Sequence, residues 1–277
     1  MVRFFAGLIG LFFSGMLLLA LFDTIYLGIT EPAEATAEHE FHKHAKDVSF
    51  AQDGPLGQYD RHQLQRGLKV FQEVCAACHS LDLIAFRNFE DLGYSKDQVK
   101  ALAKQFQVAS INPDTGEPAT RDGLASDQWP APYANEVAAR AANNNALPPD
   151  LSLITKARHN GPAYVYSLLT GYGAQPAKLL KEFPDAKTPE GLHYNPYFAN
   201  LNIAMAKPLS DGQVSFDDGS PNKVGDMAKD VSAFLAWTAQ PELEVRRQIG
   251  WASLLFLLIF TVLAYLSYRS IWADKKH

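Results

Sequence analysis

The most informative motif of the chain is Cys75-Ala76-Ala77-Cys78-His79, within the stretch RGLKVFQEVCAACHSLDLIAFR (residues 66–87). Two thiols three positions apart, followed at once by an imidazole, form the C-x-x-C-H pattern of covalent haem attachment. The spacing has a physical cause, because the thiols can reach both vinyl groups on one porphyrin edge while the histidine ligates the iron. The motif predicts one covalent haem c on Cys75 and Cys78, with His79 as an axial ligand.

Two other uses of paired cysteines are less consistent with the surrounding sequence. A zinc site would need a second ligand pair, yet the chain has only two cysteines. A thioredoxin-like redox pair would follow a strand, whereas Asp60 is a good N-cap and Leu64, Leu68 and Phe71 recur at helical spacing. The motif is therefore expected at the end of a helix, and Gly67 within that helix predicts close approach of another helix.

The candidates for the second axial ligand of the iron include the four methionines, which are Met1, Met16, Met205 and Met227. The first two belong to the apolar N-terminal segment, and Met227 falls on the apolar face of a helix predicted over residues 223–239. Met205 remains, because Pro208 favours a loop there that can lie against the haem. His159 and His193 stay open as alternatives.

Arg140 is a candidate partner for a haem propionate. It is the one charged residue in an otherwise uncharged stretch, AARAANNN, over residues 138–145. An isolated guanidinium suits a carboxylate clamp. A solvated arginine on a helix surface would give the same pattern equally well.

The C-terminal part of the chain contains a membrane-spanning segment. Residues 249–268 carry no charge and are rich in Leu, Phe and Ile, and a bilayer-spanning helix needs about 20 such residues. Arg269, Lys275 and Lys276 follow this span and predict a cytoplasmic C-terminus. Arg246 and Arg247 at the other end weaken the charge argument.

The N-terminal apolar segment allows two interpretations. Residues 4–30 are apolar apart from Asp23 and exceed the usual length of a signal-peptide core, which favours a retained anchor. Ala35-Thr36-Ala37 nevertheless has the small-residue spacing of a cleavage site. We therefore expect four regions: an apolar segment (1–30), a polar linker (31–55), a haem domain (56–245) and an anchor with a cytoplasmic tail (246–277). His39, His42 and His44 in the linker lack the cysteine or carboxylate frame of a metal site.

The charge of the region between the two apolar segments is strongly negative. The whole chain has a net charge of −5, whereas residues 31–244 contain 28 acidic and 19 basic residues, a net of −9. This distribution argues against a nucleic-acid partner. It is consistent with a basic protein partner or simply with solubility.

Several motifs in a fixed order resemble the cytochrome c1 family, the haem subunits of cytochrome bc1 complexes, especially the bacterial form. The similarity covers roughly residues 56–272. Besides the haem motif it includes AARAANNNALPPDLS (138–152), YVYSLLTGY (164–172), YNPYFANLNIAMAKPL (194–209) and FDDGSPNKVGDMAKDVSAFLAWTAQPE (216–242), followed by the C-terminal anchor.

The resemblance implies a mainly α fold: a cytochrome c-like haem domain with insertions and a C-terminal transmembrane helix, with or without an N-terminal one. It assigns haem c to Cys75 and Cys78, the axial positions to His79 and Met205, and a propionate contact to Arg140. It implies an electron-transfer subunit that is no enzyme by itself, within a dimeric complex with cytochrome b and the Rieske iron–sulfur protein.

The resemblance also implies a soluble or tethered cytochrome c as acceptor, and a haem domain on the periplasmic side of a bacterial inner membrane. Two alternatives stay open. One is a membrane-tethered c-type cytochrome that serves an oxidase, and the other is a haem enzyme of the peroxidase type, which would need an exchangeable sixth iron position.

Overall fold

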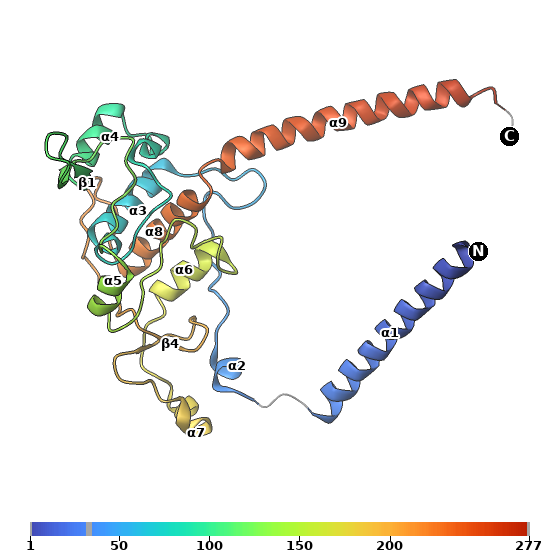
Figure 1. Cartoon of the computed structure of the whole chain (residues 1–277), viewed down its shortest axis with the longest axis horizontal. Helices are drawn as coiled ribbons and strands as arrows, with labels where there is room; N and C mark the ends of the chain where they lie inside the picture. The colour runs from blue at the N-terminus through green and yellow to red at the C-terminus, as the bar shows by residue number, and fades with distance from the viewer. Residues whose placement is uncertain (1, 32–34, 276–277) are drawn as a thin grey trace.

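The computed structural model describes residues 2–31 and 35–275, in which two long helices, α1 (Val2–Thr30) and α9 (Leu243–Trp272), project from a helical domain (Figure 1). Met1 and Lys276, both named above, lie outside the described residues. The domain contains α2 (Ala37–Phe41), α3 (Arg61–Glu73), α4 (Lys96–Ala103), α5 (Glu136–Ala142), α6 (Gly161–Leu169), α7 (Ala177–Glu182) and α8 (Val224–Ala239). The expected mainly α architecture is confirmed.

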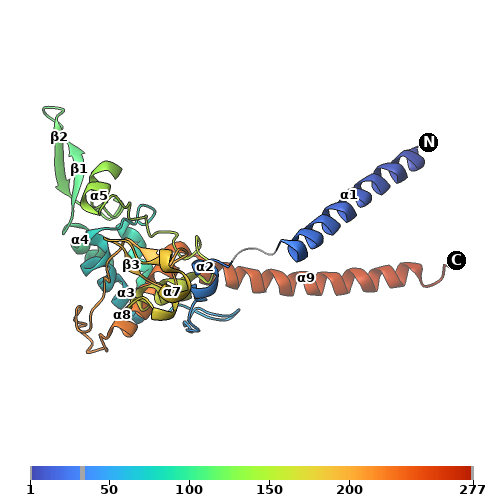
Figure 2. The same ribbon diagram turned by 90° about the horizontal axis from the view of Figure 1, so that it is seen from below.

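Short 3-10 helices and two small hairpins complete the domain. The 3-10 helices are η1 (Cys75–Ala77), η2 (Phe86–Leu92) and η3 (Pro184–Ala186). Strand β1 (Gln107–Ile111) pairs antiparallel with β2 (Pro118–Asp122), and β3 (His193–Tyr194) pairs antiparallel with β4 (Asn202–Ile203). The β1–β2 hairpin lies at the end of the domain remote from both long helices (Figure 2).

The packing of α3 against α8 forms the centre of the core. Asp60 caps the N-terminus of helix α3, and its carboxylate accepts hydrogen bonds from the first-turn N–H groups, as predicted. At Gly67 a side chain would have no room: a Cβ would lie 2.6 Å from Phe234 Cβ and would overlap the Asp230 carbonyl oxygen. The close helix approach predicted from Gly67 is therefore confirmed. Phe71 packs there against Phe234, with 5.8 Å between ring centroids.

Residues 37–55, within the predicted linker, lie against the domain. The Lys43 N–H donates to the Pro196 carbonyl at 2.7 Å, and the Lys46 N–H donates to Ser167 Oγ at 2.8 Å. Phe50 is buried in the main core. This segment is thus an ordered strap over the domain surface, although the boundary placed at residue 56 stays a prediction.

Helices α1 and α9 are both long and apolar enough to cross a membrane. Their apolar windows are exposed along their whole length, as expected for helices that face lipid. A signal sequence near an N-terminus has the same length and apolar character, so a retained anchor and a cleaved signal both stay predictions for α1.

Candidate haem-binding site

The cysteine motif forms a tight turn directly after α3. The N–H groups of Cys78 and His79 both donate to the Cys75 carbonyl, at 3.1 and 2.9 Å, so η1 brings the two thiols and the imidazole onto one turn. Both cysteines are half-buried and neither is in a disulfide. Cys75 packs against the main core. This is the arrangement that two thioether bonds to one porphyrin edge require.

The protonation chemistry of the thiols differs from that of a redox dithiol. Burial, reinforced by the neighbouring Cys78, raises the pKa of the Cys75 thiol to about 12. Redox-active dithiols instead depend on a lowered thiol pKa. Within residues 2–31 and 35–275, no three His, Cys, Asp or Glu side chains gather as a metal site. The raised pKa of the Cys75 thiol argues against a redox-active dithiol at this motif.

His79 is oriented by a single backbone contact. Its Nδ1 lies 2.8 Å from the Pro149 carbonyl oxygen, and because a carbonyl can only accept, Nδ1 carries the proton. The lone pair is then on Nε2, which is left available for iron. Burial lowers the pKa of His79, partly opposed by the Pro149 contact and by Asp150, and so favours the neutral form that ligates a metal.

The carboxylate of Asp150 connects the Pro149 segment to the residues after His79. Its Oδ2 accepts hydrogen bonds from Ser80 Oγ at 2.9 Å and from the Asp82 N–H at 2.7 Å. Asp150 therefore bonds its own segment to the residues that follow His79, and this holds the neighbouring Pro149 carbonyl in place beside the imidazole. Sequence reasoning did not identify Pro149 or Asp150, although both belong to a stretch that carries the family resemblance.

Helix α5 flanks the second cysteine. Tyr133, just before this helix, donates its hydroxyl to Cys78 Sγ at 3.7 Å and accepts a hydrogen bond from Asn143 Nδ2 at 3.0 Å. Arg140 lies on the same helix and is exposed, and its Nη1 donates to the Asn145 carbonyl at 3.1 Å. Among the described residues it forms no ion pair. An exposed guanidinium with donors to spare fits a propionate contact.

Met205 lies in a loop after β4, as Pro208 predicts, and packs half-buried against the same core as Cys75. The Tyr172 hydroxyl donates to the Met205 carbonyl at 3.0 Å and so fixes this loop. Burial raises the pKa of Tyr172, which therefore stays protonated as the donor.

The other residues considered for the second axial position are placed differently. Met227 is fully buried within α8, as expected for a core residue. His159 and His193 are both exposed. Met227 and Met205 both belong to the main core on which Cys75 packs, but Met205 is only half-buried there and lies in a loop, so its thioether is the one with a surface left for a ligand.

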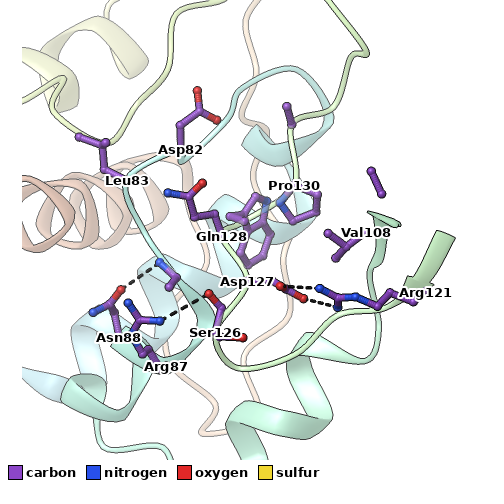
Figure 3. Close-up of a pocket in the computed structure, with 14 residues that line it drawn as sticks. Asp82, Leu83, Arg87, Asn88, Val108, Arg121, Ser126, Asp127, Gln128 and Pro130 are labelled. Carbon is purple, nitrogen blue, oxygen red and sulfur yellow. Dashed lines mark hydrogen bonds and ion pairs between the residues drawn. The ribbon is translucent and has the colours of Figure 1, made fainter. Parts of the chain in front are cut away.

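An open cleft lies elsewhere, between η2 and the β1–β2 hairpin (Figure 3). Its volume is about 600 Å³, and its lining includes Asp82 and Leu83 but no predicted site residue. On one wall, Arg121 pairs with Asp127 and lowers the pKa of that carboxyl to about 2, together with the Leu124 N–H. The cleft is therefore separate from the haem site.

Comparisons with known proteins give matches to one protein family. The family model described as "Cytochrome C1 family" matches residues 50–275. Cytochrome b/c1 of Bradyrhizobium diazoefficiens is 47% identical over 82% of this chain, but the match spans 35% of that longer protein. Cytochrome c1 1, heme protein, mitochondrial, of Arabidopsis thaliana is 44% identical over 95% of this chain and 84% of that protein. The corresponding Saccharomyces cerevisiae protein is 42% identical over 89% of this chain and 75% of that protein.

Proposed function

Because this chain belongs to the Cytochrome C1 family, whose cofactor is covalently bound haem c, we propose that it is the electron-transfer haem subunit of a quinol:cytochrome c oxidoreductase. The observation that carries the proposal is the Cys75–Cys78–His79 turn, with the imidazole already oriented by the Pro149 carbonyl. The chain is no enzyme by itself, since it passes electrons on within a larger complex.

In this proposal Cys75 and Cys78 would hold the haem, and His79 Nε2 and the Met205 thioether would ligate its iron. Haem c supplies an iron that accepts and releases one electron. The free thiols, the orientation of His79 and the shared core of Cys75 and Met205 support this assignment. Arg140 neutralises a propionate. Two protein ligands leave no open iron position, which suits electron transfer rather than oxygen or peroxide chemistry.

The proposed partners follow from the family. Cytochrome b is supported by the names of relatives, which include a cytochrome b/c1 from Bradyrhizobium diazoefficiens and a Cytochrome b-c1 complex catalytic subunit from Candida albicans. The Rieske iron–sulfur protein is the proposed electron donor and a soluble or tethered cytochrome c the acceptor, within a dimeric complex. The haem domain lies on the periplasmic side of a bacterial inner membrane, anchored by α9.

Purification of the intact membrane complex tests the partners. An affinity tag on this chain should bring down a cytochrome b and a Rieske protein. Recovery of copper-containing oxidase subunits instead would favour the tethered cytochrome that serves an oxidase.

Ligand binding separates electron transfer from peroxidase chemistry. The reduced native protein should not bind carbon monoxide, whereas Met205→Ala should bind it with a clear change in the haem spectrum. Rapid binding to the native protein would contradict Met205 ligation and support the enzyme alternative.

A further inference from the structure

A closed loop of residues 51–58 lies against the first turns of α9. The Gln58 N–H donates to the Ala51 carbonyl at 3.1 Å and closes the loop at its base. Arg247 Nη1, from α9, donates to the carbonyls of Gln52 and Gly57 at 2.9 and 2.5 Å. These hydrogen bonds hold both ends of the loop at one place on the membrane helix. In Figure 1 the loop is the blue turn beside the start of α9.

The tip of the loop reaches a residue inside the apolar span. Trp251 Nε1 donates to the Pro55 carbonyl at 3.3 Å. The charge-free residues 249–268 rise about 1.5 Å each and so span roughly 30 Å, the thickness of the hydrocarbon core. Trp251 is the third of these residues, which places its indole at the membrane boundary, where tryptophan is enriched. Pro55 therefore lies at the same depth.

The chemistry of the tip suits lipid. Residues 54–57 read Gly-Pro-Leu-Gly and carry no charge, and Leu56 is 78% exposed. The preceding carboxylate is turned away, because Asp53 Oδ2 accepts a hydrogen bond from the Phe50 N–H at 2.7 Å. An exposed leucine next to a boundary tryptophan, with no charge to desolvate, gains free energy by entering an apolar phase.

The loop is also rigid enough to keep that position. A Cβ at Gly57 would overlap backbone atoms of Gln52 and Asp53, so only glycine fits where the chain closes on itself. Gln52 is buried, which fixes the start of the loop against the domain.

We propose that residues 51–58 form a membrane-contacting loop whose tip inserts Leu56 into the edge of the hydrocarbon core beside α9, on the side of the haem domain. This inference rests on the proposed role of α9 as a membrane anchor. A helix alone would let the domain tilt and rotate about the point of attachment. The loop supplies a second contact, so the haem domain keeps a fixed height and orientation above the bilayer.

Spin-label accessibility tests the proposal. Leu56→Cys, labelled with a nitroxide in the full-length, haem-loaded protein, is placed in nanodiscs of phosphatidylethanolamine and phosphatidylglycerol. Collisions are measured with oxygen, which partitions into lipid, and with a nickel chelate, which stays in water. The matched control is Ile111→Cys, because Ile111 is 67% exposed at the end of β1, remote from α9.

The Leu56 label should show an oxygen-to-nickel ratio several times that of the Ile111 label. Trp251→Phe, which keeps the ring but removes the indole donor, should lower the ratio at Leu56 and leave Ile111 unchanged. Equal ratios at both sites would place the loop in water and overturn the proposal. Exclusion of both reagents from Leu56 would also overturn it, because protein rather than lipid would then cover the loop.

Failure of the loop proposal can be told apart from failure of the haem assignment. Cysteines bonded to haem do not react with the label, so the protein without an added cysteine should take up none. Labelling of that protein would count against the thioether bonds. The location of the loop is read independently, from the accessibility at Leu56 relative to Ile111.

Discussion

At the residue scale, the orientation of His79 depends on a backbone carbonyl that another side chain holds in place. The Pro149 carbonyl accepts the imidazole N–H, and Asp150, the next residue, bonds Ser80 Oγ and the Asp82 N–H. Partners of this kind fix the ring orientation and the basicity of a metal ligand. Asp150 is thus a positioning residue for the proposed iron site.

Asp150→Ala should loosen this arrangement. The loss of hydrogen bonds to a charged acceptor should destabilise the domain by roughly 1 to 3 kcal/mol and shift the haem midpoint potential. Asp82→Ala is the matched control, because Asp82 contributes its backbone N–H and the substitution leaves it in place. Redox titration and thermal unfolding of both variants provide the measurements. An unchanged midpoint potential in Asp150→Ala would rule out a positioning role.

Met205→Lys should leave the haem attached but lower its midpoint potential. A soft thioether raises the potential relative to an amine ligand. The decrease should be on the order of 100 mV, a fraction of the roughly 0.8 V range over which axial ligands tune haem iron. Haem staining of a denaturing gel checks attachment, and optical redox titration checks the potential. A midpoint equal to that of the unmodified protein would contradict axial ligation by Met205.

At the scale of elements, the packing of α3 on α8 determines where the cysteine motif leaves the core. Helix α3 ends at Glu73, directly before η1. The contact at Gly67 therefore sets the position of the motif as well as the stability of the core. A shift of α3 along α8 would displace the cysteines relative to Met205, which packs on the same core.

Gly67→Ala should be strongly destabilising despite the higher helix propensity of alanine. The added Cβ would overlap the Asp230 carbonyl oxygen and Phe234, and overpacking of a core costs about 1–3 kcal/mol or more. Gly225→Ala in α8 is the control, since its Cβ would lie 3.7 Å from Tyr166 Oη, an ordinary contact. Denaturant unfolding should show a lower free energy of unfolding for Gly67→Ala and little change for Gly225→Ala. If both variants had the same free energy of unfolding, α3 and α8 could move apart to admit the added Cβ without loss of stability.

At the scale of the whole molecule, the excess of acidic residues and the proposed membrane anchor, α9, lie in different parts of the chain. Residues 31–244 carry a net charge of −9, whereas basic residues flank the α9 span. An acidic domain steers a basic protein toward it, and salt weakens this attraction because the Debye length falls to about 10 Å at 0.1 M. Steering of this kind affects the rate of encounter more than the affinity.

Electron transfer to a basic cytochrome c should therefore depend on ionic strength. The second-order rate constant should fall by about tenfold or more between low salt and roughly 0.3 M salt, within the range known for electrostatic steering. Stopped-flow oxidation of the reduced protein provides the measurement. A small anionic oxidant is the control, because its rate should rise rather than fall as salt screens the repulsion. A salt-independent reaction with the basic acceptor would show that the acidic surface has no steering role.

Features that depend on residues close in sequence could be predicted without the structure. The C-x-x-C-H turn, the N-cap at Asp60, the loop at Met205 and the two apolar spans each follow from local spacing or composition. Gly67 even predicted a contact between helices, because glycine weakens a helix interior and is favoured there where another backbone comes close.

Thiol spacing predicted the haem cofactor and apolar length predicted the two long apolar helices, because both act locally, whereas the mainly α class followed from the family resemblance. The folded structure was needed to show that the Pro149 carbonyl orients His79, that Lys46 bonds the segment 37–55 to the domain, and that Trp251 bonds the Pro55 carbonyl. In each case the partners are distant in the chain and meet through single backbone atoms. Every residue carries a backbone carbonyl or N–H, so no pattern of residue types marks the one that will be used.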